Sequence, residues 1–192
     1  HSTADLASGN GFERQSNASL GAVRRYTTGM WTFIHKLGSP PWFFGFSGTL
    51  VRWLLPITVT LLVVGSIWGL LVAPPDFRQG NSYRIIYIHV PAAVVALAGY
   101  YVMAFAGAVS LIWRIKMADV TMRAAAPVGA VLTAIALVTG AIWGKPTWGT
   151  WWVWDARITS MLILFFLYLG VVALFEAYEN KAAAAKACAV LT

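Results

Sequence analysis

Charged residues are scarce in this sequence: only 11% of its 192 residues are Asp, Glu, Lys or Arg, whereas 59% are hydrophobic. A soluble domain carries about 25% charged residues, so this chain has too few to cover a water-exposed surface. Its 14 basic residues outnumber the 7 acidic ones. They lie in short stretches between apolar runs and form no patch or stripe, which disfavours nucleic acid as a partner. The composition indicates an integral membrane protein in contact with membrane lipid.

Cysteine is nearly absent, because Cys188 is the only one in the chain. A single cysteine excludes an internal disulfide, a C-x-x-C redox pair and a C-x-x-C-H haem attachment site. The sequence also lacks the G-x-x-x-x-G-K-[ST] loop with which many proteins bind ATP. If the protein takes part in thiol or haem chemistry, its own cysteine does not provide it.

Four long stretches contain no Asp, Glu, Lys or Arg, and each has about the 20 residues that a helix needs to cross a bilayer. They predict transmembrane helices at 53–75, 85–113, 124–144 and 158–175. A further apolar run begins at residue 187 and continues to the last residue, so we expect the start of a fifth span there. The predicted fold is an all-α integral membrane protein, a polytopic helical bundle of four complete transmembrane helices plus the start of a fifth.

The first 50 residues differ in character from the rest. Residues 1–29 are polar and rich in Ser, Gly and Asn, and they lack the apolar core of a signal peptide. We expect a disordered N-terminal extension with Met30 as the natural start; an Arg-containing, Ser-rich transit peptide is the alternative. Residues 30–50 are rich in aromatics and are expected to form a cytoplasmic interfacial segment, broken at Pro40–Pro41. Residues 51–192 form the predicted transmembrane domain.

The basic residues between the predicted spans indicate the orientation of the chain. Ten of the 14 lie on the side of the N-terminus, namely Arg14, Arg24, Arg25, Lys36, Arg52, Arg114, Lys116, Arg123, Lys181 and Lys186. The other side holds four, namely Arg78, Arg84, Lys145 and Arg157. Cytoplasmic segments carry the excess of Lys and Arg, so the N-terminus is predicted to be cytoplasmic. The loops at 74–84 and 145–157 then face outward together.

A tryptophan-rich stretch runs from Trp143 into the second outward loop, and five of the ten tryptophans fall within the twelve residues 143–154. One interpretation is an aromatic belt at the level of the lipid headgroups, although a belt needs fewer tryptophans at one helix end. The other is a platform for a planar, hydrophobic ligand. In a helical stretch Trp148, Trp151, Trp152 and Asp155 would share a face, and Gly149 would let the ligand approach the backbone. The Gly and Asp within the stretch favour the platform.

His89 is the candidate metal ligand. It lies between Arg84 and Pro91 at the predicted start of the second span, at the outer edge of the membrane and level with the tryptophan-rich loop. A hydrogen-bonded structural histidine is the alternative, but an ionisable residue within a span is a functional candidate by default. An imidazole beside an aromatic platform suits an iron porphyrin, with Arg84, Lys145 and Arg157 meeting the propionates. Each of these cations could equally anchor the end of a span.

Residues 148–155 match the pattern W-G-x-x-W-x-W-D, the tryptophan-rich signature of membrane haem-handling proteins. The longer strings QGNSYRIIYIHVPAA at 79–93, APVGAV at 126–131 and TGAIWGKPTWGTWWVWDAR at 139–157 are more specific. Together they resemble the haem exporter protein C (CcmC) family of cytochrome c maturation system I. The resemblance runs from about Met30 to the end and leaves out residues 1–29.

The resemblance implies a six-span protein of the bacterial inner membrane, the mitochondrial inner membrane being the alternative. It implies that haem b is held non-covalently and transiently at the periplasmic face and is then passed to a periplasmic haem chaperone. ABC transporter subunits and a small single-span membrane protein are the other implied partners. The protein would have no acid–base or nucleophilic site of its own and would not be an enzyme.

The resemblance also implies roles for particular residues. His89 takes the place of the first of two axial histidines. The signature positions are Trp148, Gly149, Trp152, Trp154 and Asp155. The second histidine belongs to an outward loop after the fifth span, so we expect it beyond Thr192.

Three other functions compete with haem delivery. A b-type electron-transfer cytochrome would hold haem between histidines on facing helices within the bilayer, and only one predicted span has a histidine. A transporter of haem or another solute would show charges or broken helices near the midplane, which the four uncharged spans lack. A purely structural subunit of a haem-export complex would not need so many tryptophans in one loop.

Overall fold

The computed structural model describes residues 40–192. The chain divides into two units, residues 1–48 and 49–192, and every site residue discussed below lies in the second. The regular structure of the described residues is helical, apart from an isolated bridge between Asp76 and Gly80. Four helical segments are long and apolar enough to cross a membrane: Phe43–Val72, Asn81–Trp113, Lys116–Trp148 and Ala156–Ala177. The prediction of an all-α polytopic membrane protein is confirmed.

The first span is the helix α2, Pro40–Ile67, which continues as a π-helical turn, η1, Trp68–Val72. Residues 41–50, predicted as part of an interfacial segment, are therefore continuous with the span. The predicted extension at 1–29 and residues 30–39 of the interfacial segment lie outside the described residues. Most side chains of α2 are exposed and apolar, as suits a helix surrounded by lipid.

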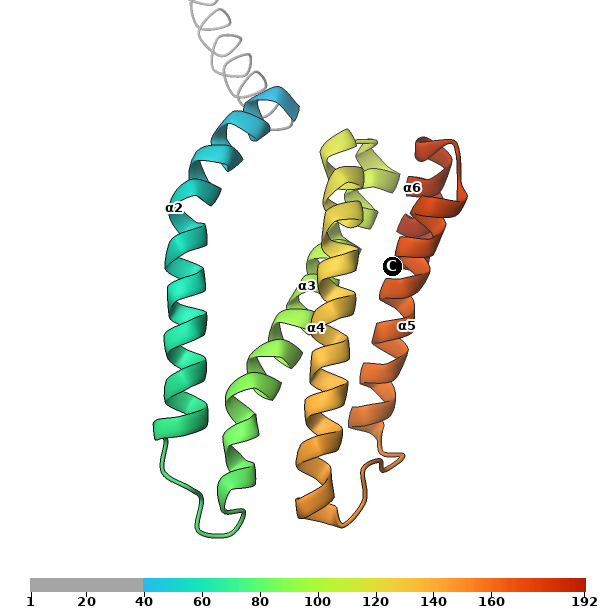
Figure 1. Ribbon diagram of the computed structural model, residues 1–192. Helices are drawn as coiled ribbons and strands as arrows, with labels where there is room; N and C mark the ends of the chain where they lie inside the picture. Colours follow the sequence, from blue (N-terminus) through green and yellow to red (C-terminus); the bar gives the residue numbers. More distant parts are fainter. Residues whose placement is uncertain (1–39) are drawn as a thin grey trace, which may run out of the picture. The chain divides into compact units, whose positions relative to one another are not determined.

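The remaining helices form a bundle in which consecutive spans run in alternating directions (Figure 1). A 3₁₀ turn, η2 at Asn81–Ile85, leads into α3 at Ile86–Trp113. The helix α4 follows at Lys116–Trp148 and α5 at Ala156–Ala177. A shorter helix, α6 at Lys181–Leu191, folds back against α3 and α5.

Several helices extend beyond the apolar stretches that predicted them. The helix α4 covers 116–148, whereas the charge-free stretch was 124–144. The difference arises because Lys116, Asp119 and other charged side chains are compatible with a helix that projects past the hydrocarbon layer. The helix α6 starts at Lys181 instead of 187, since the side chain of Asn180 accepts from the N–H groups of Ala182 and Ala183 and the alanines that follow favour helix.

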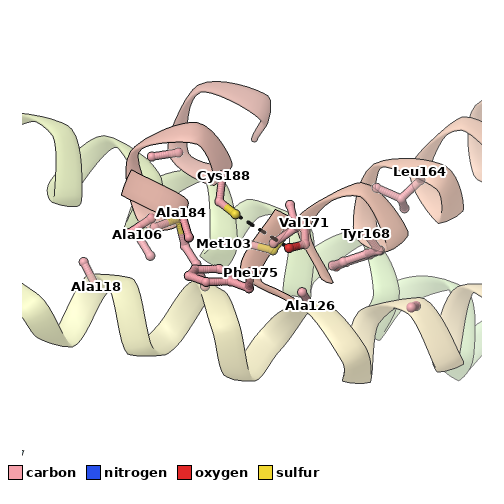
Figure 2. Close-up of a cluster of buried hydrophobic side chains, with 14 residues drawn as sticks. Met103, Ala106, Ala118, Ala126, Leu164, Tyr168, Val171, Phe175, Ala184 and Cys188 are labelled. Atoms are coloured by element: carbon pink, nitrogen blue, oxygen red, sulfur yellow. Dashed lines mark hydrogen bonds between the residues drawn. The ribbon is translucent and has the colours of Figure 1, made fainter. Parts of the chain in front are cut away.

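A buried cluster holds α3, α4, α5 and α6 together, and Figure 2 shows it in close-up. Tyr168 is its largest fully buried side chain, and its hydroxyl donates to the carbonyl of Ala96 at 2.7 Å. Gly129 lies directly beneath the Tyr168 ring, where a Cβ would collide with it. Within the same cluster the thiol of Cys188 donates to the carbonyl of Val171 at 3.6 Å. Close helix approach at small residues is typical of membrane bundles.

Candidate functional site

Two connections meet at one end of the bundle, the lower end in Figure 1: residues 73–85 between η1 and α3, and residues 149–155 between α4 and α5. The indole N–H of Trp143 donates to the side-chain carbonyl of Gln79 at 2.7 Å and joins the first connection to α4. The Asp76 carboxylate accepts from the N–H groups of Arg78 and Gln79, each at 2.8 Å. Both hydrogen bonds lower the pKa of Asp76, and the bond from the Gln79 N–H has the larger effect.

Arg84 stabilises the end of the first span. Its guanidinium donates to the carbonyls of Ala73 at 3.0 Å and Leu70 at 3.2 Å. The last carbonyls of a helical segment have no partner within it, so this cation satisfies groups that would otherwise need water. The contact matches the predicted alternative of a cation that anchors a span end.

The tryptophan-rich loop begins where α4 ends, at Trp148. Gly149 follows with φ of 77°, a left-handed conformation that favours glycine, and its N–H donates to the carbonyl of Lys145 at 3.0 Å. Residues 149–155 are not helical. The expectation that Trp148, Trp151, Trp152 and Asp155 share one helical face is therefore wrong, because Gly149 terminates the helix.

The loop folds so that its cations contact its indoles. The ammonium of Lys145 lies 5.9 Å from the centre of the Trp151 ring and donates to the carbonyl of Gly149 at 3.0 Å. The guanidinium carbon of Arg157 lies 5.3 Å from the centre of the Trp148 ring. Both distances are within the range of a cation–π interaction. Trp148 and Trp151 remain about half exposed, at 49% and 57%.

Trp152 and Trp154 form a second pair. Their ring centres are 5.5 Å apart with the rings inclined at 73°, an edge-to-face arrangement. Trp154 is 75% exposed, whereas Trp152 is turned inward. The buried indole N–H of Trp152 has no hydrogen-bond partner among residues 40–192. Such a donor usually has a partner when buried, so the position suits an acceptor on a bound molecule.

Asp155 caps the N-terminus of α5. Its carboxylate accepts from the N–H of Ile158 at 2.9 Å and forms an ion pair with Arg157 at 2.6 Å. The backbone bond from Ile158 and then the Arg157 guanidinium lower the pKa of Asp155. The last residue of the signature thus fixes the join between the loop and α5.

A cavity of about 440 Å³ lies between α3, α4 and α5. Most of its lining is aliphatic, and its four polar lining residues are His89, Trp152, Arg157 and Ser160. Small-molecule sites commonly have volumes of about 300–1,000 Å³ and combine apolar walls with a few polar groups. Three of the predicted site residues thus meet at one cavity: His89, Trp152 and Arg157. The others do not line it: Arg84, Lys145, Trp148, Gly149, Trp151, Trp154 and Asp155.

His89 is half-buried on α3 and faces α4. Its Nδ1 lies 3.0 Å from the carbonyl oxygen of Ala136 and 3.1 Å from the hydroxyl of Thr139. The ring packs edge-on against Trp143, with centres 5.8 Å apart. Gly140 adjoins the ring, since a Cβ there would lie 3.0 Å from its Cε1. The imidazole is therefore held from one side, and its Nε2 has no hydrogen-bond partner among the residues that the structure describes.

Sequence reasoning missed the α4 residues that hold His89. Thr139, Gly140 and Trp143 belong to the string 139–157 that carried the resemblance, but none was singled out as a site residue. A signal was present, because Ala136, Thr139, Gly140 and Trp143 recur at the spacing of one helical face. No group of three or more His, Cys, Asp or Glu that could hold a bare metal ion occurs within the part of the chain that the structure describes.

Comparison with known protein families gives one match that covers most of the chain. The family model described as "Heme exporter protein C" matches residues 33–192. The protein of that name from Escherichia coli K12 is 52% identical over 162 residues, which are 84% of this chain and 66% of the relative. The relatives from Haemophilus influenzae and Paracoccus denitrificans are 50% and 46% identical over 84% and 82% of the chain. The chain spans just under two thirds of the length of these relatives.

Proposed function

The chain belongs to the haem exporter protein C family, and from this premise we propose that it binds haem and delivers it for the maturation of c-type cytochromes. The proposed site is the cavity lined by His89, Trp152 and Arg157, at the outer face of the inner membrane. The proposed recipient is a periplasmic haem chaperone. ABC transporter subunits and a small single-span membrane protein are the proposed partners in the membrane.

One observation carries this proposal: residues that carry an imidazole, an indole whose buried N–H has no partner among the described residues, and a guanidinium line one mostly aliphatic cavity. The chemistry of these groups fits the parts of a haem. A neutral imidazole nitrogen is a common iron ligand, aliphatic and indole surface suits the macrocycle, and cations suit the carboxylates. Haem is the cargo of this protein, and it brings iron that can take an axial ligand.

The residues of this chain would divide the work of holding haem b without a covalent bond. His89 would supply one axial ligand, and Trp152 would cover the macrocycle and keep water from it. Arg157, already paired with Asp155, would meet a carboxylate. Trp148, Trp151 and Trp154, which are exposed at the same loop, would extend the apolar surface. The second axial histidine would come from the part of the full-length protein beyond Thr192.

Two features support an outward-facing site. The hydrogen bond between Trp143 and Gln79 joins α4, just before the tryptophan-rich loop, to the other connection at this end of the bundle. Arg78 and Arg84 lie in the first of these connections, and Lys145 and Arg157 lie within four residues of the second, whereas the ten other basic residues are those predicted for the opposite side. Positive charge is concentrated on the cytoplasmic side, so this end would face the periplasm.

The experiment that tests the proposal compares haem retention by the full-length protein and by a Trp152→Ala/Trp154→Ala variant. We expect iron protoporphyrin to bind the variant at least about tenfold more weakly, because about 1.4 kcal/mol of contact is lost. Membrane insertion should be unchanged, since both residues lie outside the spans. Trp113→Ala is the matched control, because this exposed tryptophan ends α3 remote from the cavity. Full haem occupancy in the double variant would favour an aromatic belt instead.

A further inference from the structure

We propose that Thr139 is a positioning residue that, with the carbonyl of Ala136, fixes the tautomer of His89 in which Nε2 is unprotonated and open to the cavity. The proposal deepens the proposed function, which it needs only for the identity of the ligand. The tautomer itself follows from contacts within this chain.

The carbonyl of Ala136 is the first of two acceptors that favour a proton on Nδ1 of His89. A carbonyl oxygen can only accept, and it lies 3.0 Å from Nδ1 of His89. If Nδ1 were unprotonated, two lone pairs would face each other at hydrogen-bond distance. Nδ1 is therefore the donor, and in a neutral imidazole the proton is then absent from Nε2.

Thr139 reinforces the same choice. Its hydroxyl hydrogen faces two backbone carbonyls of α4, that of Ile135 at 2.6 Å and, at a longer 3.3 Å, that of Ala136, so this hydrogen is used within α4. The oxygen lies 3.1 Å from Nδ1 and turns a lone pair to the imidazole. The two acceptors share the Nδ1 hydrogen in a half-buried setting, where hydrogen bonds are stronger than in water. The back-bonded threonine thus acts as an acceptor and not as a competing donor.

The neighbours of the ring fix its plane as well as its proton. Because Gly140 has no side chain, there is space beside Cε1 of the His89 ring. Trp143 packs against the same ring in an edge-to-face arrangement. Because Nδ1 is tied to α4, Nε2 is the nitrogen left to act from a ring that lines the cavity. An outer hydrogen bond of this kind orients a ligating histidine and raises its basicity.

The tautomer can be measured without haem by NMR of the full-length protein labelled with ¹⁵N-histidine, at about pH 8, where imidazole is neutral. His89→Ala identifies the signals. We expect the Nδ1 shift of a protonated nitrogen and the Nε2 shift of an unprotonated one. In Thr139→Val the signals should move toward a mixture of tautomers, and Thr139→Ser should restore them. Thr121→Val is the matched control, since Thr121 makes the same back-bond in α4, to the carbonyl of Met117.

A titration with iron(III) protoporphyrin gives the second readout. We expect Thr139→Val to bind it about tenfold more weakly and Thr139→Ser and Thr121→Val to bind it like the wild type. A wild-type His89 protonated at Nε2 would overturn the proposal, as would a Thr139→Val protein with unchanged nitrogen shifts and unchanged affinity. If the wild type binds no porphyrin, the proposed function fails, and the nitrogen shifts still decide the tautomer.

Discussion

At the scale of single residues, the candidate site depends on how closely α3 approaches α4 beside His89. The imidazole is bound through Nδ1 to the backbone of α4, and Gly140 is the residue that leaves room for the ring. The contact between His89 and α4 tolerates little change in side-chain volume, because close-packed interiors respond even to one added methyl group.

Gly140→Ala should therefore weaken haem binding. The new Cβ would lie 3.0 Å from Cε1 of His89, so the ring must move by a few tenths of an ångström while Nδ1 is tethered. Overpacking of this kind costs about 1–3 kcal/mol. Titration with iron protoporphyrin measures the effect. The control is Gly65→Ala in α2, where no atom lies within 4 Å of the added Cβ. Equal affinity in both variants would show that the space beside His89 is not limiting.

The prediction of site residues succeeded where the chemistry of one side chain was enough and failed where packing decides. His89 was identified because it is an ionisable residue in an apolar span, and the structure places it at a cavity with Trp152 and Arg157. Its contacts with Ala136 and Thr139 span 47 and 50 residues of sequence. Which face of α4 meets α3 is set by the whole bundle, so the periodic pattern on α4 does not by itself identify His89 as the residue that this face contacts.

At the scale of helices, their number and type followed from apolar length, but their ends did not. The thickness of the hydrocarbon layer determines how long the apolar part of a span must be. Hydrogen bonding and capping determine where the helix ends. Gly149 shows the difference. A glycine with positive φ ends α4 and turns the rest of the tryptophan-rich stretch into a loop. Glycine after a helical run is a known stop signal, and it could have been read from the sequence.

Asp155 links this loop to α5, and its removal should loosen both. Asp155→Ala removes the acceptor for the Ile158 N–H and should lower the thermal stability of the purified protein, whereas Asp155→Asn should keep the cap and lose only the ion pair with Arg157. Asp76→Ala, in the other connection, is the control for a change confined to a loop. The midpoints of thermal unfolding of the three variants are compared at neutral pH. Equal midpoints for the Ala and Asn variants would rule out capping as the role of Asp155.

The same carboxylate predicts a direction of pH dependence. The pKa of Asp155 is lowered in the folded protein, by the Ile158 backbone bond first and by Arg157 next. Its stabilising contribution is therefore complete above the ordinary aspartate pKa of about 3.9. It is lost as the pH falls from there through the lower folded pKa. The acid loss of stability should be smaller in Asp155→Ala than in the wild type.

At the scale of the whole molecule, the connections at 73–85 and 149–155 lie at the same end of the bundle, whichever way the chain is oriented in the membrane. The bond between Trp143 and Gln79 requires that Ser82 and Thr147 lie on one side of the membrane. The distribution of basic residues then predicts which side. Reporters fused at Ser82 or Thr147 should be extracytoplasmic, and reporters at Ala118 or Ala182 cytoplasmic. A cytoplasmic signal at Thr147 would invert the topology and separate the tryptophan-rich loop from any periplasmic partner.

The central claim is that His89 ligates haem iron in this cavity, and the absorption spectrum of haem bound to full-length His89→Ala tests it most directly. We predict a changed spectrum and impaired transfer to the haem chaperone, because one axial ligand is lost while the indoles and cations still retain some haem. His35→Ala, at a histidine predicted on the opposite side of the membrane, should match the wild type in both respects. An unchanged spectrum with normal delivery in His89→Ala would contradict the claim and leave His89 as a structural residue that ties α3 to α4.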